Sequence, residues 1–280
     1  MKFVGFRDEG RTLVGRVFAD ETVAAVAEVT EFYAELDTWL RVARSLTGGT
    51  RERGAVTEVP AVPLAARVLC AGLNYRLHAE EADLAIPERP GFFGRWTVSL
   101  VCGGTPVPIP PGEPGLDWEV ELAAIVGRPL NRVDPRTALE GVFGYAAFND
   151  LSCREHQMHS RLWTLGKNGD RSGPFSAIVT ADEVGDPGSG LRMRTRVNGE
   201  LMQDGTTADM IFSVGELLAY ASEVMTLNPG DVVATGTPDG VGFKRTPARY
   251  LRNGDLVEIE VDAIESIANR IVSADDPGPG

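Results

Sequence analysis

Three acidic side chains occur in segments that are otherwise apolar. Residues 117–126 (DWEVELAAIV) are typical of a buried strand, and Glu119 and Glu121 would point to the same face of it, about 6.6 Å apart at Cα. Residues 141–150 (GVFGYAAFND) form a second apolar segment, which ends in Asp150. Adjacent carboxylates on a core strand repel each other and lose hydration, so their ionisation is disfavoured unless a cation lies between them.

The chemistry of these acids points to a hard cation. Oxygen ligands on two rigid strands, with no paired cysteine or histidine nearby, suit Mg²⁺ at about 2.1 Å. The alternative is a solvated edge strand whose acids face water. The small apolar residues that flank Glu119 and Glu121 disfavour that alternative, so the sequence predicts a metal site at Glu119, Glu121 and Asp150.

A histidine and a carboxylate lie one helical turn apart on a segment that starts polar and becomes helical. His78 and Glu81 would share one side of this helix, and the acid would fix the tautomer of the ring and raise its basicity. Such pairs are also common on protein surfaces, so the spacing alone does not establish a general base. The helix breaker at 87–90 (PERP) suggests a lid, and Arg95 follows among aromatic residues.

Further polar residues could meet an anionic substrate. Arg154 and Gln157 lie one turn apart on a helix that a capping box at 152–155 (SCRE) is expected to open, although Arg154 could equally form an ordinary ion pair. Lys167 stands between glycines that allow close backbone approach. The glycine-rich loop 236–242 lacks the ending of a P-loop, so its amides and the hydroxyl of Thr237 would hold a carboxylate rather than a nucleotide.

The elements that must position these residues divide the chain into two parts. Residues 1–60 are expected to form a small α/β module, with strands at 2–6, 12–18 and 22–26 and a helix from a Thr30 cap to Leu46. Residues 61–272 would carry the chemistry, and 273–280 look disordered. In the larger part we expect strands at 67–72, 191–197, 200–203, 232–235 and 256–261, and a helix opened by a capping box at 213–216.

Composition excludes several classes of protein. Forty acidic residues against 27 basic ones give a net charge of −13, which argues against a nucleic-acid surface. No segment is long and apolar enough for a membrane span, and charged residues come too early for a secretory signal. With three widely spaced cysteines, we expect free thiols and a cytoplasmic protein. The negative charge also means that a site for an organic acid must be made locally positive.

Five segments together resemble the fumarylacetoacetate hydrolase family, in order and at plausible spacing between about residues 67 and 272. These segments are 71–78 (AGLNYRLH), 116–122 (LDWEVEL), 149–157 (NDLSCREHQ), 228–231 (NPGD) and 235–242 (TGTPDGVG). The resemblance implies an α+β, mostly β fold, a mixed β-sandwich roll that is usually a homodimer. It also implies a bound Mg²⁺, Mn²⁺ or Ca²⁺ and substrates that are 2-oxo or 2,4-dioxo acids.

The resemblance assigns roles to individual positions. Glu119, Glu121 and Asp150 match the metal ligands, and His78 and Glu81 match the base dyad. Substrate contacts are expected from Tyr75, Arg95, Arg154, Gln157, Lys167 and Thr237. Two departures bear on the substrate: Arg95 stands where many members have lysine, and Gly169 replaces a common aromatic residue.

The resulting hypothesis is hydrolysis of a carbon–carbon bond in a 2,4-dioxo acid of the acylpyruvate or fumarylpyruvate type. His78, oriented by Glu81, would deprotonate the attacking water, and the metal with Lys167 would stabilise the departing enolate. Decarboxylation of a 2-oxo acid and isomerisation of an unsaturated oxo-dioic acid would use the same site. A non-catalytic scaffold stabilised by metal is the alternative from another class, but it gives His78, Arg154 and Lys167 no reason to accompany the acids.

Overall fold

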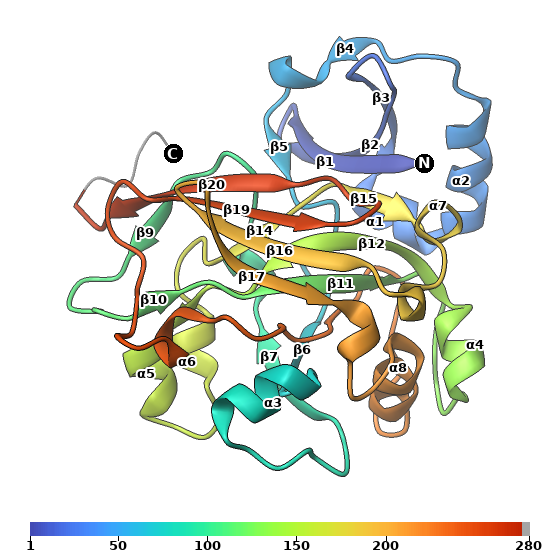
Figure 1. The fold of residues 1–280 in the computed structure, drawn as a ribbon. Coiled ribbons are helices and arrows are strands. Elements are labelled where there is room, and N and C mark those ends of the chain that lie inside the picture. The colour runs from blue at the N-terminus through green and yellow to red at the C-terminus, as the bar shows by residue number, and fades with distance from the viewer. Residues whose placement is uncertain (276–280) are drawn as a thin grey trace.

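The computed structural model describes residues 1–275, and its largest element is a 13-stranded sheet (Figure 1). The main path of this sheet runs β4-β3-β2-β1-β15-β12-β11-β18-β6-β7. Its strands are β1 (Lys2–Asp8), β2 (Arg11–Val17), β3 (Thr22–Glu28), β4 (Arg51–Glu52), β5 (Glu58–Val59), β6 (Val68–Gly72), β7 (Gly91–Arg95), β8 (Leu100–Cys102), β11 (Val120–Val126), β12 (Val142–Asn149), β14 (Gly173–Phe175), β15 (Ile178–Thr180) and β18 (Val232–Ala234).

Two smaller sheets and eight α-helices complete the described chain. The five-stranded sheet contains β9 (Val107–Ile109), β16 (Arg192–Val197), β17 (Glu200–Thr206), β19 (Leu256–Val261) and β20 (Ile267–Ser273). The two-stranded sheet contains β10 (Leu116–Asp117) and β13 (Ser152–Cys153). The helices are α1 (Val29–Ala34), α2 (Leu36–Ser45), α3 (Arg76–Ala82), α4 (Pro135–Leu139), α5 (Arg154–Met158), α6 (Thr164–Lys167), α7 (Ala181–Val184) and α8 (Val214–Ser222).

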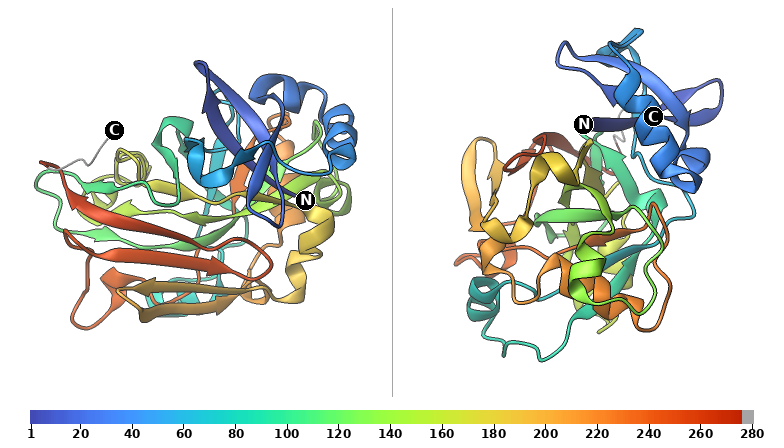
Figure 2. Two further views of the ribbon diagram at one scale, coloured as in Figure 1. Left: turned by 90° about the horizontal axis from the view of Figure 1, so that it is seen from above. Right: turned by 90° about the vertical axis from the view of Figure 1, so that its right-hand side faces the viewer.

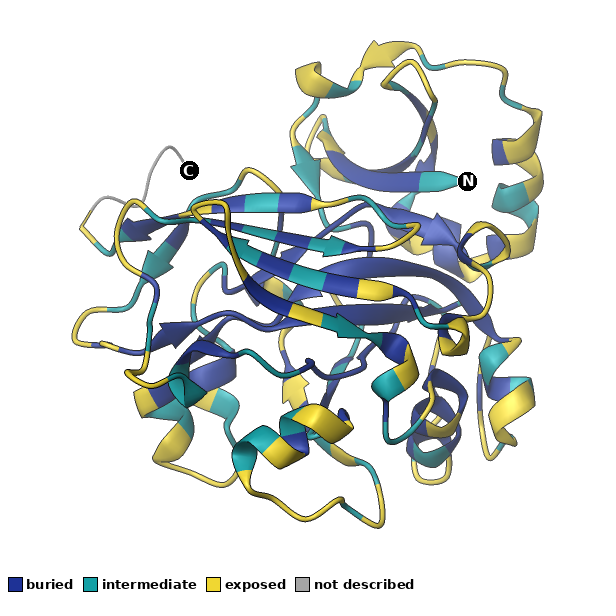
Figure 3. Cartoon of the chain, viewed as in Figure 1, coloured by how far each residue is buried: buried dark blue, intermediate teal, exposed yellow. Residues whose placement is uncertain are grey.

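The two large sheets pack face to face around the central strands β11 and β12. Both strands are buried along their whole length (Figure 3). Val120 and Leu122 point into one core together with Ile259 of the five-stranded sheet, whereas Ala123 and Ile125 belong to the core on the opposite face. The fold is thus α+β and mostly β, as predicted, and the faces of β11 alternate with the expected period of two.

The first 60 residues lie at one end of the molecule (Figures 1 and 2). Strand β1 pairs with β15, so the N-terminal strands extend the main sheet, and the rings of Phe3 and Phe32 contact Phe143 at centroid distances of 5.6 and 5.7 Å. The helix expected from Thr30 to Leu46 forms as two helices, α1 and α2. The N-terminal cap of α1 is Glu28 rather than Thr30. The carboxylate of Glu28 accepts hydrogen bonds from two backbone amides in the first turn of α1.

Two local predictions around the acids were wrong. The strand expected over 117–126 is interrupted, because 116–117 pair with β13 in a separate sheet and β11 begins only at Val120. The capping box at 152–155 does not form, because Ser152 pairs as a strand and its hydroxyl donates to the carbonyl of Asp150. The capping box at the start of α8, from Ser213 to Glu216, is confirmed.

Other sequence-based expectations meet the structure as follows. Within residues 1–275 no helix has the length and apolar character of a membrane span. Cys70, Cys102 and Cys153 are free and buried. Of the tail expected to be disordered, Ser273 ends strand β20, and residues 276–280 lie outside the described part of the chain.

Candidate active site and metal centre

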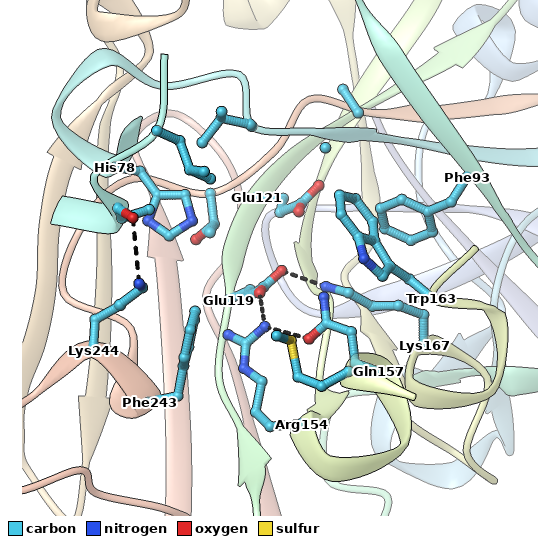
Figure 4. Close-up of a pocket in the computed structure, with 17 residues that line it drawn as sticks. His78, Phe93, Glu119, Glu121, Arg154, Gln157, Trp163, Lys167, Phe243 and Lys244 are labelled. Carbon is cyan, nitrogen blue, oxygen red and sulfur yellow. Dashed lines mark hydrogen bonds and ion pairs between the residues drawn. The ribbon is translucent and has the colours of Figure 1, made fainter. Parts of the chain in front are cut away.

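A pocket of about 310 Å³ brings together most of the residues that the sequence singled out (Figure 4). Its polar lining comes from strand β11, helices α3, α5 and α6, and the loop after β18. Its walls are apolar and partly aromatic. The lining residues are Ala71, Gly72, Leu73, His78, Ala82, Leu84, Phe93, Glu119, Glu121, Arg154, Gln157, Met158, Trp163, Lys167, Thr237, Phe243 and Lys244.

The three predicted acids lie close together beside this pocket, and Glu119 and Glu121 line it. Glu121 comes from β11, Glu119 immediately precedes this strand, and Asp150 immediately follows β12, to which β11 is paired. One carboxylate oxygen from each residue lies within 4.8 Å of the others, and all three residues are buried. This all-oxygen, buried donor set fits a divalent cation such as Mg²⁺ or Mn²⁺.

Electrostatics around the acids indicate a need for positive charge. Burial and the neighbouring carboxylates of Asp150 and Glu119 raise the pKa of Glu121 well above its ordinary value. Burial acts in the same direction on Glu119, but Lys167 and Arg154 outweigh it and lower the pKa of that carboxyl to about 2. A divalent cation beside Glu121 would supply the positive charge that this residue lacks.

Lys167 and Arg95 supply positive charge inside the cluster. The ammonium of Lys167 donates to Glu119 Oε2 at 2.6 Å and to Asp150 Oδ2 at 2.7 Å. Burial alone would lower the pKa of Lys167, but Asp150 and Glu119 raise it, so this lysine is a cation rather than a base. The guanidinium of Arg95 donates to Asp150 Oδ1 through Nε at 3.0 Å and Nη2 at 2.6 Å.

Arg154 joins the acidic cluster to the rest of the pocket. Its Nη1 lies 2.7 Å from Glu119 Oε1 and donates to Gln157 Oε1 at 2.8 Å, while Nε donates to Asp117 Oδ2 at 2.9 Å. The ion-pair alternative for Arg154 therefore holds with Asp117 and Glu119, and the residue also lines the pocket. A fixed guanidinium of this kind can present its remaining donors to a carboxylate.

The two members of the predicted dyad, His78 and Glu81, are in contact on helix α3. Nδ1 of His78 lies 3.0 Å from Glu81 Oε2, and Glu81 Oε1 accepts from the backbone amide of Gly240 at 3.0 Å. With its proton on Nδ1 toward the acid, the ring would keep Nε2 as the proton acceptor. Gly240 has φ +93°, and a Cβ there would meet the carbonyl of Met202, so glycine is required at this close approach.

Acids from the β10–β11 segment hold the glycine-rich loop at both ends. The amide of Gly236 donates to Glu121 Oε2 at 2.9 Å, and the amide of Gly242 donates to Asp117 Oδ1 at 2.7 Å. Between these ends, Thr237 faces the pocket and its hydroxyl accepts from Gln203 Nε2 at 2.8 Å. The loop therefore places Thr237 in the pocket lining, and its contact with a substrate carboxylate stays a prediction.

Two residues expected to contact substrate do not line the pocket. Tyr75 is fully buried, and its hydroxyl donates to the sulfur of Met193 at 3.1 Å. Arg95 lies behind Asp150, and its side chain has no exposed surface. The partner of Arg95 is thus Asp150, a candidate metal ligand, rather than the substrate that the sequence predicted.

Sequence reasoning missed three residues that hold the site together. Asp117 accepts from Arg154 and from the amides of Trp118, Gly242 and Phe243. Gln203, in the hairpin strand β17, orients Thr237 and accepts from the amide of Val120. Glu113 accepts from the amides of Glu155 and His156 and from the ring of His156 at the start of α5. The available signal was that Asp117 and Glu113 lie just before the acidic strand.

Comparison with known proteins identifies the family. The family description Fumarylacetoacetate (FAA) hydrolase C-terminal matches residues 67–272, and the chain belongs to this family of enzymes. The human protein named oxaloacetate tautomerase FAHD2A, mitochondrial, is 36% identical over 250 residues, which cover 87% of this chain and 79% of that protein.

Solved structures agree with this assignment. A putative HpcE protein from Mycobacterium smegmatis superposes with a TM-score of 0.89 at 31% identity, covering 98% of this chain and 100% of the other. Fumarylpyruvate hydrolase from Pseudomonas aeruginosa, solved with Mn²⁺ and pyruvate, gives a TM-score of 0.69 at 32% identity, covering 78% of this chain and 92% of that one. The neighbour with Mn²⁺ and the buried acids of this chain both favour a divalent metal.

Proposed function

We propose that this protein hydrolyses a carbon–carbon bond in a 2,4-dioxo acid of the acylpyruvate or fumarylpyruvate type. The observation that carries the proposal is that a histidine oriented by a carboxylate lines the same pocket as Glu119 and Glu121, two members of a buried group of three carboxylates. The first can activate water, and the second can hold a cation beside an oxo acid. A hydrolytic neighbour, fumarylpyruvate hydrolase, adds support.

Residues at the floor of the pocket bind the oxo-acid end of the substrate. Glu119, Glu121 and Asp150 would hold the ion, with Mg²⁺ expected and Mn²⁺ or Ca²⁺ as alternatives, and the ion when bound supplies Lewis acidity. Arg154 and its neighbours Gln157 and Thr237 orient the substrate by hydrogen bonds to its carboxylate.

Proton transfer is the task of His78. Its Nε2 takes a proton from a water molecule, whose oxygen attacks the C4 carbonyl carbon of the substrate. The C3–C4 bond then breaks, and its electron pair stays on C3 as the enolate of pyruvate. The ammonium of Lys167 stabilises the developing negative charge, and the proton held by His78 passes to C3. The products are pyruvate and a carboxylic acid.

Product analysis with two variants tests this proposal. Incubation of the Mg²⁺-loaded protein with acylpyruvates should release pyruvate and one equivalent of acid, detected by NMR. His78→Ala should abolish turnover while retaining metal binding in calorimetry, and Glu119→Gln should lose both. Full activity of either variant, or an acylpyruvate left intact by the unsubstituted protein, would contradict the mechanism.

Tautomerisation of a 2-oxo acid is the second candidate. The observation that favours it is the similarity to the human protein named oxaloacetate tautomerase. This reaction only moves a proton from the enol oxygen on C2 to C3, or in the reverse direction, which the His78–Glu81 dyad could perform without attacking water. Enol-to-keto conversion of oxaloacetate, followed by ultraviolet absorbance together with a pyruvate assay, distinguishes tautomerisation from decarboxylation and from hydrolysis of acylpyruvates.

Two features outside the pocket stay predictions. We expect a homodimer, which sedimentation equilibrium would report as twice the 30.0 kDa chain mass. We also expect a cytoplasmic location, which fractionation of the source cells would test.

A further inference from the structure

Three cationic side chains line the pocket, and two of them are neutralised by acids. Arg154 pairs with Asp117 and Glu119, and Lys167 pairs with Glu119 and Asp150. Lys244 differs from both, because within residues 1–275 no carboxylate oxygen lies within the 4.0 Å ion-pair distance of its Nζ.

The contacts that Lys244 does make are weak. Its ammonium lies 3.5 Å from the carbonyl oxygen of Ala82, at the limit of hydrogen bonding, and 5.1 Å from the centroid of the Phe243 ring. The side chain is partly exposed, so its charge stays hydrated at little cost while the pocket is empty. An anionic group entering the pocket would therefore meet an uncompensated cation.

Lys244 lies on the side of the pocket where water attack is expected. Figure 4 shows it beside His78, across Glu119 from Lys167 and Trp163. Apolar side chains also line the pocket, among them Leu84, Met158 and Phe243. The pocket thus combines acids for a metal, an apolar part of its lining, and a second positive charge on the His78 side.

We propose that Lys244 binds a second carboxylate, so that the preferred substrates are oxo diacids with an acid group at the end remote from the 2-oxo acid. This assignment of Lys244 rests on the proposed function, because it takes from that mechanism the position of C4 beside His78. The substituent beyond C4 would then extend toward Lys244. The apolar part of the lining suits the short carbon chain or double bond between the two acid groups. The net charge of −13 makes such a local cation necessary for binding a dianion.

The alternative role of Lys244 is to cap the C-terminal end of α3 through the carbonyl of Ala82. That role would hold His78 in place for every substrate alike. The two roles therefore differ in selectivity, since only a carboxylate-binding lysine discriminates diacids from monoacids of the same length.

The test compares Lys244→Met with the unsubstituted protein on butanoylpyruvate and succinylpyruvate, whose acyl chains have the same number of carbons. A lost charge-assisted contact costs about 1.5 kcal/mol, so the preference in kcat/KM for the diacid should fall about tenfold. Lys244→Arg should retain that preference. If Lys244→Met leaves the ratio of the two kcat/KM values unchanged, the proposal is overturned and the capping role remains. This holds whether both substrates are slowed equally or neither is slowed.

A binding measurement separates this inference from the proposed function. Calorimetry on the Mg²⁺-loaded protein with 2-oxohexanoate and 2-oxohexanedioate needs no turnover, because neither ligand has a 4-oxo group. The diacid should bind more tightly than the monoacid. In Lys244→Met the ratio of the two dissociation constants should fall about tenfold. Equal affinities in the unsubstituted protein would refute the role of Lys244. Failure to hydrolyse either acylpyruvate, with this binding difference intact, would refute only the hydrolase assignment.

Discussion

Replacing Lys167 by methionine tests whether the acidic cluster depends on a cation. The side chain of Lys167 is only 3% exposed, and its ammonium contacts two buried carboxylates at 2.6 and 2.7 Å. Methionine has nearly the same length and no charge, so Lys167→Met removes the cation without opening a large cavity. The remaining positive charges on the cluster are then Arg95 on Asp150 and Arg154 on Glu119.

The expected effect on stability is large. Removing one partner of a buried ion pair costs about 3–5 kcal/mol, and the two arginines that remain place the value near the lower end, about 3 kcal/mol. Each kcal/mol shifts the melting temperature of a chain this size by about 2–4 °C, so we expect a fall of about 6–12 °C in the metal-free protein. A divalent ion at 100 times its Kd adds about 2.7 kcal/mol and should restore most of the loss.

Calorimetric melting with a chelator and with excess Mn²⁺ measures both effects. The stabilisation by Mn²⁺ should be greater in Lys167→Met than in the unsubstituted protein, because the variant has no ammonium that competes with the ion for Glu119 and Asp150. Lys244→Met is the matched control, since Lys244 lines the same pocket and pairs with no carboxylate among residues 1–275, and the stability of this variant should change little. If Lys167→Met and Lys244→Met have the same melting temperature in the presence of chelator, the reasoning is refuted.

Two further substitutions address residues that hold the site, and a third addresses the cap of helix α8. Gln203→Leu removes the donor to Thr237 and should raise KM for the oxo acid, whereas an unchanged KM would mean that Thr237 needs no orientation. The ring and backbone donors of His156 outweigh burial and lower the pKa of Glu113, so its contribution to stability is present at neutral pH and is lost as the pH falls. The gap in melting temperature between Glu113→Gln and the unsubstituted protein should therefore narrow below about pH 4.3, and a constant gap would contradict the assignment. Ser213→Ala should cost about 1 kcal/mol in urea unfolding through the lost cap of α8, with unchanged turnover.

The sequence allowed the clustering of the three acids to be predicted because its signals are local. Glu119 and Glu121 interrupt an apolar pattern with a spacing of two, and Asp150 ends a second apolar segment. Pairing of β11 with β12 then brings the acids together, since Val120 lies opposite Asn149. The dyad was predictable for the same reason, because one helical turn fixes the separation of its two members.

Other parts of the site depend on contacts between distant segments. Arg95 pairs with Asp150 across 55 residues, and Gln203 reaches Thr237 across 34, so neither spacing follows a helix or strand period. The capping box at Ser152 failed because a competing strand pair with β10 recruits that residue. Tyr75 belongs to a motif that lines the pocket elsewhere, but burial against Met193 directs its hydroxyl away from the pocket. Tertiary pairing, rather than local propensity, decided each of these outcomes.

Anomalous diffraction from crystals grown with Mn²⁺ tests the central claim most directly. We predict a single strong peak per chain at the floor of the pocket, in contact with carboxylate oxygens of Glu119, Glu121 and Asp150. The same crystals of Glu121→Gln should show that peak weakened or missing. A peak held by other residues, or no bound ion in a chain that still turns over its oxo acid, would contradict the account.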